Sequence, residues 1–211
     1  MAKGVFITLE GGEGAGKSSQ AKMLGDVLNA RGHNVLLTRE PGGATGAEAI
    51  RKLLVEGPGG HWDGITEALL HTAARRDHLV NAVWPALEAG KIVVSDRFVD
   101  STVAYQGYAH GVDLEMLRTL YKTAIGDFKP HLTLILDLPV DAGLKRAAKR
   151  GGSETRYESM GLKFHELVRK GFQDIAKAEP DRCKVIDAAQ DIETIHRAIV
   201  AEVLKVLLEA A

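Results

Sequence analysis

Hydrophobic positions follow two different periods along the chain, and their alternation predicts an α/β fold. Short apolar runs rich in β-branched residues predict five strands, at 5–9, 34–38, 91–96, 132–137 and 184–187. Apolar residues three or four apart predict five helices. The first begins directly after Lys17, and the others cover about 47–55, 66–88, 114–125 and 195–207. The long helix over 66–88 is expected to kink at Pro85. Strands and helices in alternation are typical of a doubly wound, five-stranded parallel sheet.

A glycine-rich loop after the first predicted strand matches the phosphate-binding pattern G-x-x-x-x-G-K-[ST]. A strand enters this loop and a helix leaves it, which is the context in which the pattern binds phosphate; a turn that binds nothing explains the combination poorly. Lys17 would reach the β- and γ-phosphates of a nucleotide, and Ser18 would ligate Mg²⁺. The residues expected to bind ATP are Gly11, Gly12, Glu13, Gly14, Ala15, Gly16, Lys17, Ser18 and Ser19.

Charge balance and cysteine content exclude several classes of protein. With 27 basic and 28 acidic residues, the chain lacks the global field of a nucleic-acid or membrane-surface protein. Cys183 is the only cysteine, so no internal disulfide can form, and its apolar neighbours favour an inert, buried thiol. No apolar run approaches the length of a membrane span. We therefore expect a soluble, cytoplasmic protein of one domain, residues 1–211.

Asp96 and Arg97 end the third predicted strand, where open α/β sheets bind their ligands. Asp96 is a candidate for the Mg²⁺ coordination sphere, directly or through water. Arg97 suggests a second substrate that carries a phosphate, although the two residues could also form an ion pair that caps the strand. Arg51 and Arg75 lie on the helices between strands two and three, and each alone could be an ordinary surface residue.

A basic segment lies between the fourth and fifth strands and ends at two glycines. Its basic residues are Lys145, Arg146, Lys149 and Arg150. Such a segment is either a solvated helix face or a mobile lid that brings cations to the γ-phosphate, and we predict a lid at about 146–157. The eight histidines show no paired metal spacing, so Mg²⁺ is the only metal expected.

Several blocks of the sequence resemble bacterial thymidylate kinase, in the order of that family over essentially the whole chain. The blocks cover residues 6–18, 38–43, 46–51 and 96–107. The last contains Asp-Arg-aromatic-x-x-Ser-x-x-Ala-Tyr-Gln, which is distinctive of the family among phosphate-loop kinases. The resemblance implies the P-loop nucleoside monophosphate kinase fold. It also implies transfer of the γ-phosphoryl group of ATP to dTMP, giving dTDP and ADP, in dTTP biosynthesis.

The resemblance also implies how the acceptor nucleotide is bound. Its residues would be Glu13, Arg51, His71, Arg75, Arg97, Ser101, Thr102, Tyr105 and Gln106. Arg51 and Arg97 would hold the acceptor phosphate, and Arg75 would reach a thymine oxygen. Tyr105 would pack under the sugar and disfavour a ribose 2′-hydroxyl, while Glu13 would accept a hydrogen bond from the 3′-hydroxyl.

Two positions depart from the commoner pattern of the family. Gly14 stands where one branch has an arginine in the loop, and the branch without it uses arginines of the lid. The resemblance therefore implies Arg150, with Lys149 or Arg146 beside it, as the catalytic cation of the lid, and Arg156 is a further candidate. Lys17 and Arg97 complete the expected catalytic residues. His71 stands where the family usually has a phenylalanine that stacks on thymine, and imidazole offers less area for stacking.

The partners expected are ATP and dTMP, together with a second copy of the chain, because the family is commonly homodimeric through its helices. Two other functions remain possible from the residues alone. A deoxynucleoside kinase would share the fold and the loop, but it needs a carboxylate base for a neutral hydroxyl, whereas this chain offers arginines. A GTPase or regulatory module would also carry the loop, although the sequence contains no Asn-Lys-x-Asp signature.

Overall fold

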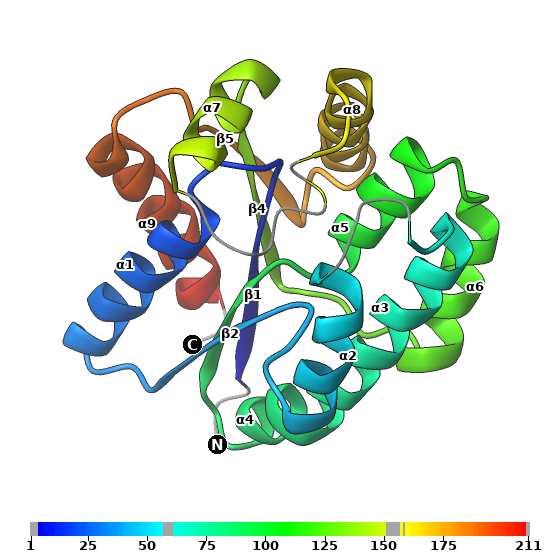
Figure 1. Cartoon of the computed structure of the whole chain (residues 1–211). Helices are drawn as coiled ribbons and strands as arrows, with labels where there is room; N and C mark the ends of the chain where they lie inside the picture. Colours follow the sequence, from blue (N-terminus) through cyan, green and yellow to red (C-terminus); the bar gives the residue numbers. More distant parts are fainter. Residues whose placement is uncertain (1–3, 57–60, 151–156, 158, 210–211) are drawn as a thin grey trace.

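Five parallel strands form a single sheet at the centre of the described part of the chain (Figure 1). The structure, a computed structural model, describes residues 4–56, 61–150, 157 and 159–209, with the side chain of Arg150 excluded. The strand order is β2-β3-β1-β4-β5. The strands are β1 (Val5–Glu10), β2 (Val35–Arg39), β3 (Ile92–Asp96), β4 (Leu132–Asp137) and β5 (Cys183–Asp187). Each agrees with its predicted range to within one residue at either end, which confirms the doubly wound parallel sheet.

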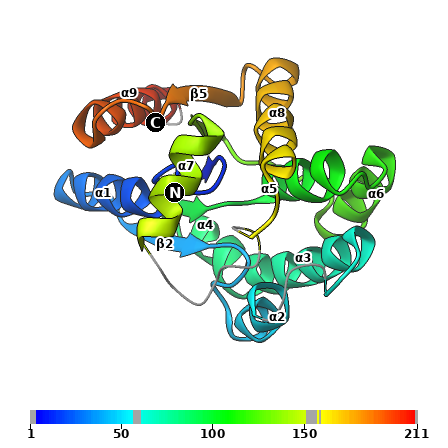
Figure 2. The same ribbon diagram turned by 45° about the horizontal axis from the view of Figure 1, so that its top comes forward.

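Helices cover both faces of this sheet (Figures 1 and 2). The helical elements are α1 (Lys17–Ala30), α2 (Thr45–Val55), α3 (Gly64–His78), η1 (Leu79–Val83), α4 (Trp84–Glu88), α5 (Val99–Thr102), η2 (Val103–Ala109), α6 (Leu114–Ile125), α7 (Val140–Arg150), α8 (Leu162–Ala178) and α9 (Ile192–Glu209). The helices α1 and α9 pack on one face, and α3, α4, α6 and α8 lie on the other. No helix in the described ranges is long and apolar enough to cross a membrane.

The strands are apolar on both sides because both faces of the sheet are buried. Successive side chains of a strand point to opposite faces. Ile7 and Leu9 accordingly pack with α1 and α9, whereas Phe6 packs with η1 and α4. The same division separates Val94 from Val93 in β3. All five side chains are fully buried, so a one-residue slip in register would exchange the two halves of the core.

The predicted long helix is confirmed, but its middle is π-helical. The elements α3, η1 and α4 follow one another without a break, and the backbone N–H of Trp84 donates to the carbonyl of Leu79. Proline has no N–H, and its ring clashes with the carbonyl four residues earlier in a regular helix. A widened turn directly before Pro85 relieves that clash, so the chain accommodates the proline by a local π turn.

Two helical regions were not predicted from the sequence. The consecutive elements α5 and η2 follow the Asp-Arg pair, and α8 precedes β5. Apolar side chains at four-residue spacing, Phe164, Val168 and Phe172, do mark one face of α8 and pack toward η2. The first of these regions carries Ser101, Thr102, Tyr105 and Gln106, so its omission concerned residues expected to bind the acceptor.

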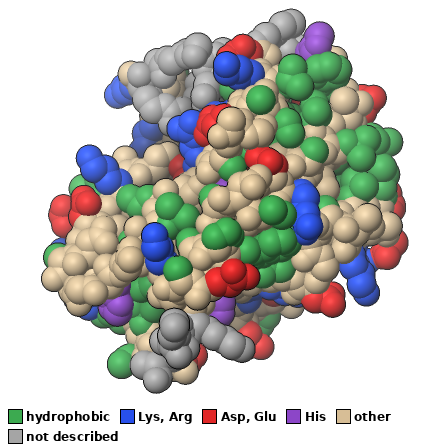
Figure 3. All heavy atoms as spheres, turned by 90° about the horizontal axis from the view of Figure 1, so that it is seen from below, with side chains coloured by type: hydrophobic (Ala, Val, Ile, Leu, Met, Phe, Trp, Pro, Cys, Tyr) green, Lys and Arg blue, Asp and Glu red, His purple; other side chains and the backbone are tan. Residues whose placement is uncertain are grey.

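Charged and hydrophobic side chains share the lower face of the molecule. Viewed from below, acidic and basic residues are interspersed, and hydrophobic side chains form separate areas between them (Figure 3).

Cys183 is buried at the start of β5, and burial together with the nearby Asp100 raises the pKa of its thiol to about 12. The thiol therefore stays protonated and unreactive at neutral pH.

A buried ion pair joins the segment before β5 to α5. Arg182 donates two hydrogen bonds to Asp100, at 2.7 and 3.0 Å, and the side chains are 11% and 5% exposed. The same guanidinium donates to the hydroxyl of Thr133 in β4. This bidentate contact fixes the start of β5 against the element that follows Arg97.

Replacement of Arg182 by methionine should destabilise the fold strongly, because Asp100 would remain buried without its cation. The expected loss is about 3–5 kcal/mol in the free energy of unfolding. Urea denaturation measures it directly. Arg118→Met is a matched control, since Arg118 pairs with Glu115 at the surface, where both side chains are about two-thirds exposed, and should cost less than about 1 kcal/mol. Equal losses in both variants would contradict the prediction.

Candidate active site

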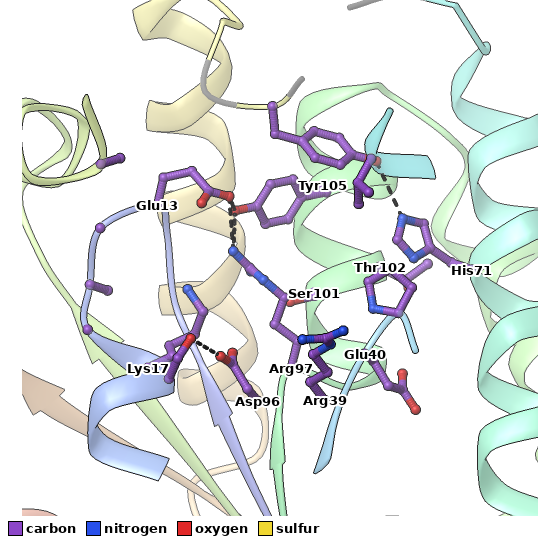
Figure 4. A pocket seen from close by; sticks show the side chains of 18 of the residues that line it. Glu13, Lys17, Arg39, Glu40, His71, Asp96, Arg97, Ser101, Thr102 and Tyr105 are labelled. Carbon is purple, nitrogen blue, oxygen red and sulfur yellow. Dashed lines mark hydrogen bonds and ion pairs between the residues drawn. The ribbon is translucent and has the colours of Figure 1, made fainter. Parts of the chain in front are cut away.

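A cleft with a volume of about 470 Å³ opens at the carboxyl edge of the sheet (Figure 4). Most of the predicted site residues line it: Glu13, Gly14, Ala15, Gly16, Lys17, Ser18, Ser19, Arg51, His71, Asp96, Arg97, Ser101, Thr102, Tyr105 and Gln106. Arg39, Glu40, Pro41, Arg146 and Tyr157 also line it. Arg39 and Glu40 lie at the end of the second predicted strand, and Arg146 and Tyr157 belong to the predicted lid segment. The cleft thus joins the glycine-rich loop to the ends of β2 and β3 and to α3 and η2.

The glycine-rich loop between β1 and α1 has the geometry of an anion site. Gly14 and Gly16 have φ angles of 68° and 91°, which suit glycine and turn backbone N–H groups toward one point. The ammonium of Lys17 lies across the loop and donates to the carbonyls of Gly11 and Gly12, at 3.0 and 2.8 Å. Burial and the nearby Arg97 lower the pKa of Lys17 to about 8. The hydrogen-bond acceptors of Lys17 in the loop are neutral carbonyls, so an anion bound there would supply a negative charge next to the ammonium.

Helix α7 packs directly against this loop through two glycines. A Cβ atom at Gly14 would overlap the carbonyl oxygen of Gly143, and a Cβ atom at Gly143 would overlap the carbonyl of Glu13. Gly14 also has a positive φ, where other residues are strained. In this arrangement position 14 has no room for a side chain, so an arginine could not stand there.

Ser18 and Asp96 meet at the start of α1 and the end of β3. The hydroxyl of Ser18 donates to Oδ2 of Asp96 at 2.5 Å (Figure 4). A hydroxyl and a carboxylate so close together are oxygen ligands of the type that Mg²⁺ takes, with substrate phosphates completing its shell. The described residues hold no cluster of three or more His, Cys, Asp or Glu side chains that could bind a metal without such help. The donor set therefore fits a nucleotide-bound Mg²⁺.

Arg97 connects the loop to η2 through four hydrogen bonds. One terminal nitrogen donates to the carbonyl of Gly11 and the hydroxyl of Ser101, both at 3.1 Å. The other donates to Oε1 of Glu13 at 3.0 Å and to the hydroxyl of Tyr105 at 3.1 Å. The residue has a φ of 71°, which is uncommon for a residue with a side chain. Such a conformation is typical of residues that the surrounding structure holds in place for function.

Glu13 is a partly buried carboxylate that three neighbours stabilise in its charged form. Burial acts to raise its pKa, but Arg97 and Lys17 outweigh that effect, and Tyr105 donates a hydrogen bond to it at 2.7 Å. The pKa of Glu13 is consequently about 2. At neutral pH the cleft therefore contains a carboxylate between two cations, available to accept a hydrogen bond from a ligand hydroxyl.

Glu10 shapes the turn that carries Arg97. It is fully buried at the end of β1 and accepts hydrogen bonds from the backbone N–H of Phe98 at 2.7 Å and from the hydroxyl of Ser101 at 2.5 Å. Burial and the negative charge of Asp100 raise the pKa of Glu10 to about 8. Glu10 thus ties the chain after β3 to the end of the neighbouring strand, which holds Arg97 over the loop.

Arg75 is not exposed to the cleft in this structure. It is 4% exposed and donates from Nε to Oε2 of Glu40 at 2.8 Å and from a terminal nitrogen to the hydroxyl of Thr102 at 3.1 Å. Oε1 of Glu40 contacts Nδ1 of His78 at 3.1 Å, and Nε2 of His78 contacts the hydroxyl of Thr38 at 2.6 Å. This buried chain of contacts links the end of β2 to α3 behind Glu40, which does line the cleft.

The far end of the cleft is polar. Nε2 of His71 and Nε2 of Gln106 each lie 3.4 Å from the hydroxyl of Tyr157, and His71 is drawn with its ring toward that hydroxyl in Figure 4. Arg51 of α2 also lines the cleft and donates to the carbonyl of Pro41 at 2.5 Å. The cleft thus has a cationic end at the loop and a hydrogen-bonding end at η2.

Comparison with known proteins identifies the family. A model described as thymidylate kinase matches residues 9–199. The chain is 52% identical to the thymidylate kinase of Caulobacter vibrioides over 199 residues, which cover 94% of this chain and 95% of that one. It is also 52% identical to the thymidylate kinase of Gluconobacter oxydans over 204 residues, covering 95% and 94% of the two chains. The chain belongs to the thymidylate kinase family.

A solved structure supports the same assignment. The crystal structure of thymidylate kinase from Ehrlichia chaffeensis superimposes with a TM-score of 0.72 at 38% identity and covers 98% of this chain and 99% of that one. The five-stranded sheet is thus the P-loop nucleoside monophosphate kinase fold that the resemblance implied. The family is one of ATP-using kinases, so the loop and its lysine belong to a nucleotide-binding enzyme.

The predicted lid falls largely outside the described residues, since 151–156 and 158 and the side chain of Arg150 are not described. Lys149 is exposed near the end of α7. Arg146, one turn earlier, lines the cleft and donates to the carbonyl of Ala188 at 3.1 Å. The basic face of α7 therefore begins at the edge of the site.

ATP binding should be coupled to proton uptake by Lys17. Its pKa of about 8 in the free protein will rise when the phosphates of ATP add negative charge, so protons are taken up between about pH 8 and pH 10. Isothermal titration calorimetry at about pH 8.5, in buffers of different ionisation enthalpy, should give binding enthalpies that depend on the buffer. At pH 7 Lys17 is already mostly charged, and the dependence should nearly vanish. Buffer-independent enthalpies at the higher pH would contradict the lowered pKa.

Proposed function

We propose that this cleft transfers the γ-phosphoryl group of ATP to dTMP and releases dTDP and ADP. Family membership supports the reaction, because the matching model and the relatives are thymidylate kinases. The observation that carries the proposal is the position of Arg97, whose guanidinium lies against the phosphate loop at the end of β3. A cation there can hold an acceptor phosphate next to the phosphoryl group that the loop presents.

The donor nucleotide would lie in the loop, with its phosphates on the backbone N–H groups of residues 11–19 and on Lys17. Ser18 and Asp96 would hold Mg²⁺ through the oxygens that now contact each other. When bound, the ion would neutralise charge on the β- and γ-phosphates. Lys17 would exchange the carbonyls of Gly11 and Gly12 for phosphate oxygens, so its ammonium would contact negatively charged acceptors in place of neutral ones.

The acceptor phosphate would be held by Arg97 and Arg51, which both line the cleft. Both side chains currently donate to groups of the protein, which a phosphate would replace in part. Glu13, ionised and next to Tyr105, would accept the sugar 3′-hydroxyl, while the ring of Tyr105 would pack under the sugar. A phosphate oxygen is already a nucleophile, so positioning and charge neutralisation supply the catalysis without a general base.

The thymine base would occupy the polar end of the cleft near η2. Ser101, Thr102, Gln106 and His71 line that end, and Arg75 lies behind Thr102. Arg75 would reach the base only through a shift of its side chain or through the hydroxyl of Thr102. His71 offers an imidazole where the family usually has a larger aromatic ring, so base stacking would be weaker here.

The basic end of α7 would supply the remaining cations. In this proposal the chain is one kinase domain, residues 1–211, with a lid at about 146–157 that brings Arg150 and Lys149 over the γ-phosphate. The position of Arg146 at the cleft edge supports it, because residues three and four positions further on share a helix face with Arg146. Gly14 supports it too, since the loop has no room for a cation of its own.

A homodimer would cover the apolar surface at the start of α3. Ile65 and Leu69 are one helical turn apart and are 47% and 49% exposed, and Leu53 at the end of α2 is 50% exposed. The indole of Trp62 donates to the carbonyl of Leu53, so the two helix ends are adjacent. Exposed aliphatic side chains grouped in this way favour burial against a second copy of the chain.

Turnover of a panel of nucleoside monophosphates and free thymidine, with ATP and Mg²⁺, tests the proposed reaction. We expect diphosphate formation with a clear preference for dTMP over the other monophosphates, and very slow use of thymidine. Efficient phosphorylation of thymidine, or ATP hydrolysis that ignores every acceptor, would contradict the proposal.

Arg97→Lys should damage acceptor use specifically. Lysine keeps the charge but loses the forked geometry, and one bidentate phosphate contact is worth about 2–4 kcal/mol, or on the order of a hundredfold in kcat/KM for dTMP. The KM for ATP should change little. Arg76→Lys provides the control, because Arg76 lies over the ring of Trp84, outside the cleft. If Arg97→Lys leaves the kinetics of the acceptor intact, its phosphate binds elsewhere.

Leu69→Glu should convert the proposed dimer to monomers, because a charge would be buried at its centre. Sedimentation velocity at micromolar concentration measures the change. Leu208→Glu is a matched control at the end of α9, where the leucine is 80% exposed, and should leave the sedimentation coefficient unchanged. A wild-type protein that sediments as a monomer would rule out the interface.

A further inference from the structure

A buried carboxylate stands directly behind the polar end of the cleft, and the reaction described above gives it no role. Glu67 of α3 is 1% exposed and does not itself line the cleft. Nitrogen and hydroxyl groups of three side chains surround its Oε2 atom: Nε2 of Gln106 at 2.9 Å, the hydroxyl of Tyr157 at 3.0 Å and Nε2 of His110 at 3.4 Å. Two of these side chains, Gln106 and Tyr157, reach the cleft.

The carboxylate determines which way the amide of Gln106 faces. A carboxylate accepts hydrogen bonds and donates none, so the amide must turn its NH₂ group toward Glu67. The same NH₂ group lies 3.4 Å from the hydroxyl oxygen of Tyr157, which gives its second hydrogen an acceptor. A flipped amide would place its oxygen against the carboxylate, with two acceptors in contact. No hydrogen-bond donor in the described ranges pairs with Oε1 of Gln106, the atom left for a ligand.

Tyr157 is constrained in the same sense. Its single O–H donates to Glu67, so only lone pairs remain on its oxygen for other partners. Those lone pairs face Nε2 of Gln106 and Nε2 of His71, each at 3.4 Å. Glu67 therefore accepts hydrogen bonds from the amide of Gln106 and from the hydroxyl of Tyr157. The atom left for a ligand at this end of the cleft is an acceptor, Oε1 of Gln106.

We propose that Glu67 is a positioning residue that makes the cleft selective for a pyrimidine with an N–H on its pairing edge. Thymine and uracil carry a hydrogen on N3, which can donate to Oε1 of Gln106. Cytosine has an acceptor at N3 and would meet that oxygen with a lone pair. This inference rests on the proposed function for the identity of the acceptor. It adds that selectivity is set by a residue that touches no substrate.

The effect of one fixed amide on selectivity is large enough to measure. A site built to pair with a ligand hydrogen rejects the analogue without it because its own buried polar atom is left unsatisfied. A glutamine at position 67 has the same shape but offers both an oxygen and an NH₂ group. The amide of Gln106 could then face either way, and an acceptor on the base would be met by a donor.

Glu67→Gln should therefore lower the ratio of kcat/KM for dTMP to that for dCMP by about tenfold or more. We expect the change to arise from a weaker KM for dTMP together with better use of dCMP, while the KM for ATP stays the same. Glu88→Gln, an exposed glutamate of α4, is the matched control and should keep the wild-type ratio. Thermal melting of each variant checks that the fold is retained.

Two further variants separate the role of Gln106 from that of Tyr157. Gln106→Leu removes the amide but leaves Glu67 with its other partners, and it should also abolish most of the discrimination between dTMP and dCMP. Tyr157→Phe removes the hydroxyl but leaves the contact between Gln106 and Glu67, and it should retain the discrimination.

The inference would be overturned if Glu67→Gln left the ratio of kcat/KM for dTMP to that for dCMP unchanged. If Glu67→Gln does not fold, an unchanged ratio in Gln106→Leu would overturn it instead. Loss of the ratio in Tyr157→Phe alone would overturn it too, because selectivity would then depend on the tyrosine. Failure of the proposed function would be distinguishable from failure of this inference. In the first case the wild-type protein would not phosphorylate dTMP at all, which the panel of acceptors would reveal before any variant is compared.

Discussion

The four hydrogen bonds of the Arg97 guanidinium hold the two halves of the site together. One half is the glycine-rich loop, which Arg97 contacts through Gly11 and Glu13, and the other is η2, which it contacts through Tyr105. Glu10 supports the left-handed backbone at Arg97, because it accepts hydrogen bonds from the backbone N–H groups of Phe98 and Ser101, which follow Arg97 in the chain. The buried side chain of Glu10, at the end of β1, thus fixes the position of Arg97, directly after the neighbouring strand β3.

Much of the fold could be predicted because its signals are local. The strands are apolar runs, and the loop is a contiguous motif whose strand and helix are its immediate neighbours in the sequence. Helix α8 shows where local signals mislead. Gly171 lies in its middle, where glycine weakens a helix, yet a Cβ atom there would come within 3.0 Å of Tyr108 and 3.1 Å of Ala104. The close approach of η2 requires the glycine, and that requirement is visible only in the packed structure.

Most residues that line the cleft could be predicted from the sequence, but the contacts between them could not. The rule that ligands bind beyond the carboxyl ends of parallel strands was enough to select Asp96 and Arg97. The partner of Arg75 could not be found in this way, because Glu40 is 35 residues away, in the segment directly after β2. The contact of Glu67 with Gln106 joins α3 to η2 in the same manner. Pairings of this kind depend on how helices pack, and no spacing in the sequence encodes them.

The contact between Gly14 and Gly143 has a consequence for how such a site can change over evolutionary time. The backbone of the loop and the backbone of α7 touch at these two residues, so neither can gain a side chain while the other stays in place. A lineage could place a cation in the loop only after α7 had withdrawn, and the withdrawal would also displace the basic residues that α7 carries. Intermediates would lack both sources of charge, so a cation in the loop and a displaced α7 are expected to arise together or not at all.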